Sequence, residues 1–333
     1  MDSIKSDVIV EVNNLVKYFP LKRSFISFFT REKNQMIKAV DRISLKIHEG
    51  EIVGLAGESG CGKSTTGMTI IKLYEPTSGE IYFGSENIAH YQGEKLKNFR
   101  KNAQMVFQDP FESLDPRLTV FNTVVEPLEN FNINDRHERV ERVTNALEQA
   151  ELKPPQDFFD IFPHNLSGGQ RQRVAIARAL VLDPKFLVAD ELVSMLDVSI
   201  RAGILRLLKH LTKKRKLASL FISHDLSLIR YICDITAIMY LGRIAEIGPT
   251  EEIIQKPLHP YSQALMSGIP IPNPRYRRKR IEIIGEVPSP INLPEGCRFH
   301  TRCRSLSKKC KEIEPELFVV KDNHQVACHL YIT

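Results

Sequence analysis

The sequence has no run of about 18 or more uncharged apolar residues anywhere in its 333 residues. A helix needs roughly 20 mainly apolar residues to cross a bilayer, so no segment is expected to span a membrane. The N-terminal residues also lack the basic-then-apolar layout that is typical of a secretory signal. These absences predict a cytoplasmic location, in which any membrane role depends on docking to a membrane partner.

Internal repeats, low-complexity tracts and long heptad runs are missing as well. This excludes solenoid and long coiled-coil architectures. The 42% hydrophobic and 26% charged residues are ordinary for a globular protein that buries a core. A net charge of +6 is mild, and it fits phosphate-rich ligands, nucleic acid or an anionic membrane without choosing among them.

Short apolar runs and amphipathic segments predict an α/β fold. A strand, a glycine-rich loop and a helix follow one another from residue 51, which is the first unit of an α/β sheet. The apolar runs predict strands at 8–12, 43–47, 51–56, 185–190, 219–223 and 235–240. The helical patterns lie at 119–152, 171–182 and 199–214.

The glycine-rich loop fits the phosphate-binding pattern G-x-x-x-x-G-K-[ST]. Its residues are Gly57, Glu58, Ser59, Gly60, Cys61, Gly62, Lys63, Ser64 and Thr65. Glycines let successive backbone N–H groups turn towards phosphate oxygens. Lys63 is expected to reach the β- and γ-phosphates, and the Ser64 hydroxyl to ligate Mg²⁺. The loop by itself predicts binding of a nucleoside triphosphate.

Two acidic residues, Asp190 and Glu191, follow the apolar run 185–190. An acid at the carboxyl end of such a strand is expected beside the phosphate loop. Asp190 can hold Mg²⁺ directly or through water, and Glu191 can then polarise the attacking water as a general base. The alternative is a pair that only caps a helix.

A second phosphate site is predicted by Leu166, Ser167, Gly168, Gly169 and Gln170, which stand just before a long helical pattern. A serine and two glycines at a helix start offer N–H groups and a positive dipole end to an anion. One chain therefore carries two phosphate-binding helix starts. Their simplest use is to clamp one nucleotide between two subunits.

The string LSGGQ resembles the signature of ABC ATPases, and nearly the whole chain is similar to that family. The resemblance implies ATP hydrolysis by a P-loop NTPase with a RecA-like core, an antiparallel β subdomain and a helical signature subdomain at about 110–180. It makes Phe19 the aromatic residue that stacks on adenine, with Tyr18 as runner-up and a core residue as the alternative. Gln108 matches the glutamine that contacts Mg²⁺ and water and senses the membrane subunit. Ser194, Leu196 and Asp197 match the loop that crosses the dimer interface, and His224 matches the histidine that contacts the γ-phosphate.

The sequence departs from family usage at Leu192 and Met195, where proline and alanine are usual. Loss of the proline frees a φ angle. Because Asp190 and Glu191 are both present, the chain is still expected to hydrolyse ATP. Turnover that is slower or altered is left open.

The C-terminal part resembles the extension of oligopeptide/dipeptide permease ATPases. The similarity lies in LHPY (258–261), FQDPFESLDPR (107–117), PIPNP (270–274) and VPSPINLPEGCRFHTRC (287–303). It implies an F-type subunit that pairs with a homologous D-type ATPase beneath two membrane permease subunits, at the cytoplasmic face of the membrane, and that serves a solute-binding protein indirectly. Nucleic acid is not an expected partner. The cargo is expected to be peptides, with sugars, nickel or another solute as alternatives, and a regulatory or redox-sensing ATPase subunit remains a rival function.

These resemblances predict an ATPase domain at 1–256 and a small cysteine-containing extension at 257–333. In the extension, Cys297, Cys303, Cys310 and Cys328 are separated by five, six and seventeen residues. Four thiolates suit an iron–sulfur cluster or tetrahedral zinc, with His300 and His329 as substitute ligands and ordinary thiols as the alternative. The family resemblance implies a 4Fe–4S cluster.

Two further segments have open roles. The stretch 24–29 is expected to be a loop insertion that could touch a membrane, and the basic run 275–280 is expected to be a solvated linker or a contact to phosphate groups.

Overall fold

The computed structural model describes residues 7–21, 35–109, 113–269, 281–321 and 323–332. The segments 24–29 and 275–280 lie outside the described residues. The chain divides into two compact units. The first unit holds residues up to Glu11, Lys46–Ile52 and Tyr82–Ile222, and the second unit holds Val12–Leu45, Val53–Ile81 and Ser223–Thr333.

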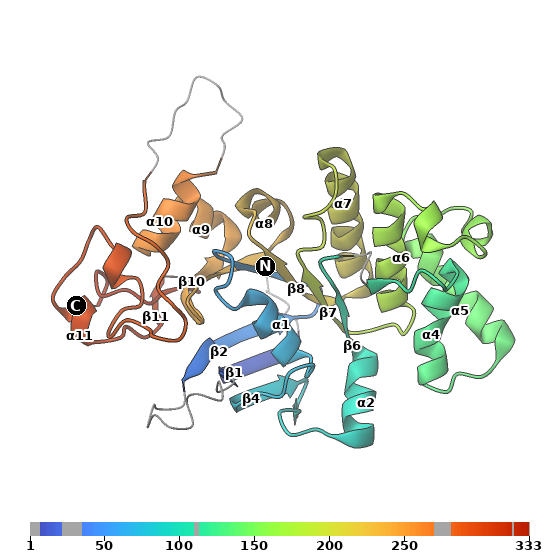
Figure 1. Ribbon diagram of the computed structural model, residues 1–333, viewed down its shortest axis with the longest axis horizontal. Coiled ribbons are helices and arrows are strands. Elements are labelled where there is room, and N and C mark those ends of the chain that lie inside the picture. Colours follow the sequence, from blue (N-terminus) through green and yellow to red (C-terminus); the bar gives the residue numbers. More distant parts are fainter. Residues whose placement is uncertain (1–6, 22–34, 110–112, 270–280, 322, 333) are drawn as a thin grey trace, which may run out of the picture. The chain divides into compact units, whose positions relative to one another are not determined.

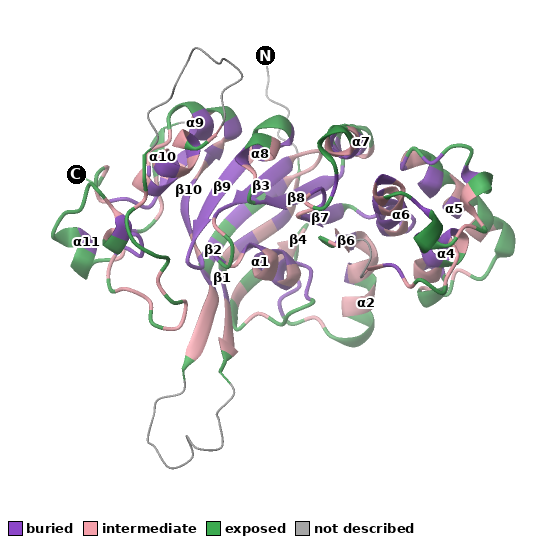
Figure 2. Ribbon diagram, turned by 45° about the horizontal axis from the view of Figure 1, so that its top comes forward, coloured by how far each residue is buried: buried purple, intermediate pink, exposed green. Residues whose placement is uncertain are grey.

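The first unit contains a parallel arrangement of strands β6, β7 and β8. Their bounds are Ala103–Val106, Phe186–Asp190 and Ala218–Ser223. Val188 of β7 pairs with Met105 on one side and Leu220 on the other. Every residue of β7 and β8 is buried, as Figure 2 shows. Strands covered on both faces carry continuous apolar runs, which is why the sequence predicted both correctly.

Helices α4, α5 and α6 of the first unit pack on one another (Figure 1). The helices of this unit are α2 (Gly93–Asn102), α4 (Val120–Asn130), α5 (Arg136–Gln149), α6 (Gly168–Leu180) and α7 (Val198–Arg215), with 3₁₀ turns at Pro155–Phe158 and Pro163–Asn165. Side chains cap the helix starts, because Thr119 accepts a hydrogen bond from the Asn122 backbone and Asp135 from the Glu138 backbone. The predicted helical block is confirmed, with its boundaries set by these caps.

A four-stranded sheet has the order β2-β1-β4-β5. The bounds are β1 Val8–Pro20, β2 Met36–His48, β4 Ser78–Phe83 and β5 Glu86–Asn87. The boundary between the units passes along the chain through β1, β2 and β4. The predicted strands at 8–12 and 43–47 lie inside β1 and β2. In β2, Ile43, Leu45 and Ile47 alternate with exposed residues and are buried, which is the period of a strand with one covered face.

The second unit has a strand arrangement to which the C-terminal residues contribute. Strand β3 (Ile52–Ala56) pairs in parallel with β9 (Ile235–Tyr240), and β10 (Arg243–Pro249) pairs antiparallel with β9. On the other side of β10 lies β12 (His324–Val326), followed by β11 (Phe318–Lys321). The C-terminal extension therefore continues the same sheet rather than forming a separate lobe.

The helices of the second unit are short. They are α1 (Lys63–Ile70), α8 (Leu226–Ile232), α9 (Thr250–Gln255), α10 (Pro260–Ser267) and α11 (Lys309–Glu312), with a 3₁₀ turn at His300–Arg302. Among the residues that the structure describes, no helix has the length and apolar character needed to cross a membrane.

Candidate nucleotide-binding site

The predicted phosphate loop of the second unit follows the buried strand β3 and leads into α1. Its glycines at 57, 60 and 62 have φ angles of 152°, 77° and 104°, which lie in the region that side chains rarely adopt. A Cβ atom on Gly57 would lie 2.2 Å from the carbonyl oxygen of Met239, and one on Gly62 would lie 2.0 Å from that of Ala39. Only glycine fits these two positions.

Lys63 occupies the inside of this loop. Its ammonium group donates hydrogen bonds to the carbonyl oxygens of Gly57 (2.8 Å) and Glu58 (3.0 Å), and the residue is only 6% exposed. Ser64 and Thr65 follow in the first turn of α1, where N–H groups and the helix dipole favour an anion. Ser59 and Gly60 form the exposed tip of the loop. Burial raises the pKa of the Cys61 thiol, so this cysteine is a packing residue of the loop.

The two aromatic candidates have different surroundings. The Tyr18 hydroxyl donates to the Asp41 carboxylate at 2.9 Å, and burial together with this neighbour raises the pKa of Tyr18 to about 12. The Phe19 ring packs edge-on against Tyr74, with 5.3 Å between ring centroids, and Lys17 lies 4.8 Å from its centroid. Tyr18 is thus held by a side-chain partner, and Phe19 is the better candidate to stack on a base.

His224 directly follows β8 and is exposed. The next residue, Asp225, caps α8 by accepting a hydrogen bond from the Ser227 backbone at 2.8 Å. The chain thus turns sharply after the buried strand, which leaves the histidine at the strand end as predicted.

In the first unit, Asp190 and Glu191 stand at the carboxyl end of β7. Asp190 is 4% exposed and pairs in register with Ile222. Glu191 has a φ of 46°, in the left-handed region, and its N–H donates to the Ile222 carbonyl at 2.9 Å. The left-handed region is uncommon for a residue other than glycine, asparagine or aspartate, and Glu191 is one of several residues of the described chain that adopt it.

The two departures from family usage differ in burial. Leu192 is 1% exposed, whereas Met195 is 61% exposed. Leu192 is a packing residue of this turn. The larger Met195 side chain lies on the surface of the loop that was predicted to cross a dimer interface.

That loop is fixed by Arg201 of α7. The Arg201 guanidinium donates to the carbonyl oxygens of Leu196 (2.7 Å) and Ser194 (3.2 Å). Leu196 is buried, and Asp197 is the N-cap position of α7. The sequence analysis did not single out Arg201, because a lone arginine inside an amphipathic helix carries no signal of its target.

The LSGGQ string forms the start of α6. Ser167 and Gln170 make a capping box, in which Ser167 Oγ accepts from the Gln170 N–H at 3.3 Å and Gln170 Oε1 accepts from the Ser167 N–H at 2.9 Å. A Cβ atom on Gly169 would lie 2.7 Å from Ile200 Cγ2, while one on Gly168 would make ordinary contact with Leu196 at 3.5 Å. Leu166 is buried beneath this start. The structure thus brings the signature helix against the predicted interface loop.

Gln108 lies two residues after β6 and is exposed. Residues 110–112 of the similar segment 107–117 lie outside the described residues.

The four C-terminal cysteines gather in the second unit, but they do not form a ligand set. Cys297, Cys310 and Cys328 are buried and Cys303 is partly exposed, all as free thiols. Burial, with the neighbouring cysteines, raises the pKa of Cys297 to about 12 and that of Cys328 to about 11. Within the described ranges, no group of three or more His, Cys, Asp or Glu side chains is arranged to hold a metal ion. The expected 4Fe–4S site therefore finds no support in this arrangement.

Comparisons with known proteins agree with the geometry of these loops. Residues 40–194 match the family model described as ABC transporter, and residues 245–310 match that of the oligopeptide/dipeptide transporter C-terminal region. The oligopeptide transport ATP-binding protein AppF of Bacillus subtilis (strain 168) is 46% identical over 334 residues, which cover 99% of this chain and 100% of that protein. The chain belongs to the family of ATP-binding subunits of oligopeptide ABC transporters.

Solved structures of ABC ATPases share the fold. The dimeric ATP-binding cassette MJ0796, in a post-hydrolysis state bound to ADP and Pi, is 31% identical with a TM-score of 0.62, covering 72% of this chain and 98% of that one. The cassette cbiO1 of Clostridium perfringens, part of the ABC transporter complex cbiONQ, is 28% identical with a TM-score of 0.62, covering 75% of this chain and 92% of that one. As a member of this family, the chain is an ATPase subunit that works as a dimer with membrane permease subunits.

Proposed function

We propose that this chain hydrolyses ATP to power the import of oligopeptides or dipeptides, docked at the cytoplasmic face of the membrane. The observation that carries the proposal is the combination, in one chain, of the Lys63 phosphate loop, the LSGGQ helix start and the peptide-transporter region at 245–310. The first two features supply ATP chemistry. The third distinguishes peptide importers from other users of the same ATPase.

Residues of the phosphate loop and of the strand ends carry the proposed ATP chemistry. Lys63 and the N–H groups at the start of α1 hold the phosphates, and Phe19 stacks on adenine. Mg²⁺, when bound with ATP, neutralises charge on the β- and γ-phosphates. Ser64, Asp190 and Gln108 offer the hard oxygen ligands that this cation prefers. Glu191 takes a proton from the attacking water, and His224 donates a hydrogen bond to the γ-phosphate.

The proposed active unit is a head-to-tail pair of ATPase chains. The phosphate loop of each chain and the LSGGQ helix start of the other enclose one ATP, and Ser194, Leu196 and Asp197 cross the interface. The expected mate is a homologous D-type subunit, and a solute-binding protein delivers the peptide to the two permease subunits. ATP closes the pair because its γ-phosphate adds contacts that ADP lacks, and hydrolysis reopens it. The ATPase domain is proposed at 1–256 and the extension at 257–333.

The test is reconstitution of this chain with its mate and permease subunits in liposomes. Peptide uptake that depends on ATP, together with ATPase activity stimulated by peptide-loaded binding protein, is the expected result. Uptake of a sugar or nickel in place of peptides would overturn the cargo assignment while leaving the ATPase role intact. ATPase activity that no tested cargo stimulates would favour a regulatory subunit.

We also propose that the four C-terminal cysteines can carry a 4Fe–4S cluster. The support is that four thiols gather in one small region and influence each other's pKa. As described above, no group of three or more ligand side chains in the described residues is arranged to hold a metal ion, so binding requires a local rearrangement of the extension. An iron and sulfide assay on anaerobically purified protein tests this, with the Cys303→Ser, Cys310→Ser double variant as a control. Zinc, or no metal, in the wild-type protein would overturn the proposal.

A further inference from the structure

The C-terminal extension contacts the phosphate loop through Arg302. Its guanidinium donates to both carboxylate oxygens of Glu58, with Nη1 2.8 Å from Oε2 and Nη2 3.3 Å from Oε1. Nη1 also lies 3.4 Å from the Tyr240 hydroxyl. The Arg302 side chain is 7% exposed and that of Glu58 is 25% exposed. Such a two-pronged pair fixes both the position and the direction of the carboxylate.

A second contact holds the backbone of the same residue. The Glu58 N–H donates to the Tyr261 hydroxyl at 3.0 Å. Tyr261 is fully buried, and its ring packs against Tyr240 and Phe299 with centroid distances of 4.7 and 5.3 Å. The N–H of Glu58 is therefore directed at the extension, and the phosphate must be held by other N–H groups of the loop.

These two contacts rest on a rigid frame. Glu246 of β10 is fully buried and accepts hydrogen bonds from the backbone N–H groups of Leu258 (2.7 Å) and His259 (2.9 Å). Its carboxylate also lies 2.7 Å from His324 Nε2 on β12. The start of α10, which carries Tyr261, is thus anchored to the strands beneath it.

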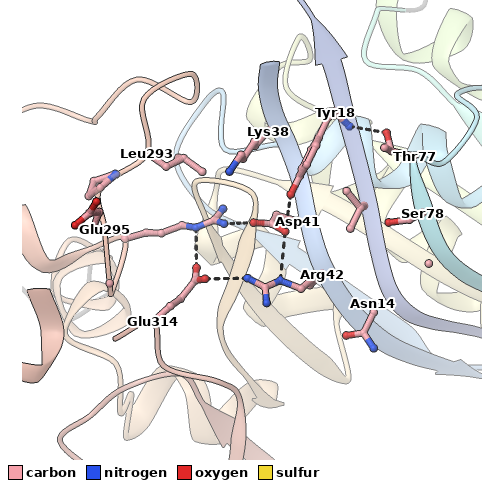
Figure 3. Close-up of a pocket in the computed structure, with 15 residues that line it drawn as sticks. Asn14, Tyr18, Lys38, Asp41, Arg42, Thr77, Ser78, Leu293, Glu295 and Glu314 are labelled. Atoms are coloured by element: carbon pink, nitrogen blue, oxygen red, sulfur yellow. Dashed lines mark hydrogen bonds and ion pairs between the residues drawn. The ribbon is translucent and has the colours of Figure 1, made fainter. Parts of the chain in front are cut away.

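The extension also contacts the strand next to the aromatic candidates. Arg298 pairs with Asp41, whose other oxygen accepts from the Tyr18 hydroxyl, and Arg298 Nε donates to Glu314 at 3.0 Å. Arg42 also joins this network, because its Nη2 donates to Glu314 at 3.0 Å. Figure 3 shows Tyr18, Asp41, Arg42 and Glu314 pointing towards one another. These residues line a cavity of about 730 Å³. One arginine of the extension therefore contacts the phosphate loop directly, and a second contacts Asp41, the hydrogen-bond partner of Tyr18.

Glu58 places a carboxylate in the loop that is expected to bind phosphate. A free carboxylate there would repel the triphosphate, whose charges have the same sign. Arg302 both neutralises the carboxylate and holds it to one side. We propose that Arg302 is a positioning residue for ATP, through which the C-terminal extension keeps the phosphate loop competent to bind. This inference rests on the proposed function and assigns the extension a role at the nucleotide site.

The test measures nucleotide affinity of the full-length chain by titration with a fluorescent ATP analogue in the presence of Mg²⁺. Arg302→Met is expected to weaken binding about tenfold, because it leaves the Glu58 carboxylate unpaired. At saturating ATP, kcat of the variant paired with its mate stays within about twofold of wild type, since Arg302 touches no reacting atom. Arg302→Lys, which keeps the charge but not the fork, is expected to lie between the two.

The double variant Arg302→Met, Glu58→Gln separates positioning from simple structural support. Removing the unpaired charge is expected to restore affinity to within about threefold of wild type. The loss of affinity caused by Arg302→Met is also expected to be larger for ATP than for ADP, because ATP carries more phosphate charge for Glu58 to repel. The same loss is expected to be smaller at high salt, because salt screens this repulsion. Arg304→Met is the matched control, since Arg304 is an exposed arginine two residues away and its loss should leave affinity unchanged.

Each result decides the matter. A wild-type chain that binds no ATP overturns the proposed function itself. If the wild-type chain binds ATP and Arg302→Met binds it equally well, only the present inference fails. The inference also fails if adding Glu58→Gln to Arg302→Met does not restore ATP affinity. It fails as well if Arg302→Met lowers the affinities for ATP and ADP by the same factor. Should Arg302→Met not fold, Arg302→Lys decides: it is expected to bind ATP about threefold more weakly than wild type, and affinity equal to wild type overturns the inference.

Discussion

At the residue scale, Glu191 combines a strained backbone with a chemical role that the sequence suggested. Its φ of 46° is held by the hydrogen bond from its N–H to Ile222 and by Ser194, whose N–H and hydroxyl both donate to the Glu191 carbonyl. These hydrogen bonds fix the backbone of Glu191 at the end of β7, from which the carboxylate extends.

Glu191→Gln is expected to stop hydrolysis while leaving ATP binding intact. The amide has the same shape but cannot take a proton, so kcat should fall by roughly 10²- to 10⁴-fold. The affinity for Mg·ATP should stay within about threefold, and the pair should remain closed with ATP bound. Phosphate release and size-exclusion chromatography with ATP measure the two effects. Turnover near the wild-type rate would remove Glu191 as the general base.

The two aromatic neighbours Tyr18 and Phe19 are expected to differ in their effect on ATP binding. Base stacking on an aromatic ring is worth about 1–3 kcal/mol, so Phe19→Ala should weaken ATP binding by roughly 5- to 100-fold. Tyr18→Phe is the matched control: it removes only the hydroxyl that donates to Asp41, and should leave ATP affinity near that of wild type. If wild type and Phe19→Ala bind ATP with equal affinity, Phe19 is a packing residue and does not stack on adenine.

At the element scale, the start of α10 depends on a buried histidine. His259 caps the helix by accepting a hydrogen bond from the Tyr261 N–H at its Nδ1 (3.0 Å), and Pro260 follows as the first helical residue. Burial lowers the pKa of His259 from 6.5 to about 4, and the neighbouring Glu246 offsets this only in part. The neutral ring is therefore the form that the folded state requires, because the protonated ring cannot accept this hydrogen bond.

The pH dependence of stability follows from this shift. Between pH 6.5 and about 4 the unfolded chain binds the proton and the folded chain does not, so stability is complete above pH 6.5 and falls as the solution is acidified. The loss should approach about 1.4 kcal/mol per pH unit inside that window. Denaturant unfolding of wild type at pH 7, 6 and 5 measures it.

His259→Asn provides the control for this pH effect. Asparagine is a good N-cap but does not titrate, so the variant should keep the helix start and show a smaller loss of stability over the same pH range. An unchanged pH slope in the variant would assign the acid sensitivity to other groups.

The elements also show where sequence patterns suffice. Strands β7, β8 and β9 are predicted within a residue or two, because strands covered on both faces carry mainly apolar residues without a polar-apolar alternation. Strands β11 and β12 are not predicted, since they have four and three residues and β11 has exposed side chains at most positions. β12 pairs with β10, which lies far away in the sequence, and β11 in turn pairs with β12.

At the scale of the whole molecule, the residues of the proposed chemistry are far apart in the sequence. The phosphate loop, Phe19 and His224 belong to the second unit, whereas Asp190, Glu191, Gln108 and the LSGGQ helix belong to the first. The LSGGQ helix is proposed to serve the ATP held by the mate. A substitution in this helix should therefore lower the ATPase activity of the pair. It should leave ATP binding by the chain that carries the substitution unchanged.

Gly168→Asp is expected to show this asymmetry. The new side chain has room, because a Cβ atom at 168 has its nearest neighbour at 3.5 Å, and its carboxylate would face the phosphates of the mate's ATP. ATPase activity of the pair should fall at least about tenfold, while the variant chain alone should bind ATP as wild type does. Full activity of the pair carrying this variant would contradict the shared-site arrangement.

The sequence by itself determined the chemistry that is encoded locally. The phosphate loop and the start of the signature helix are each formed by a few consecutive residues. Their glycines, lysine and cap residues shape the backbone of the same short segment, so residue type and spacing are enough to identify them. Family membership and the buried strands follow from the same local information.

Only the tertiary structure showed which distant side chains contact these segments. Arg302 lies 244 residues after Glu58, and Tyr261 lies 203 residues after it, so no local pattern could pair them. The same holds for the cysteines, whose spacing suggested a cluster that the folded arrangement does not assemble. Side chains far apart in sequence meet only when the sheet brings β10, β12 and the extension together, because the direction of a long side chain is set by packing rather than by its neighbours in the chain.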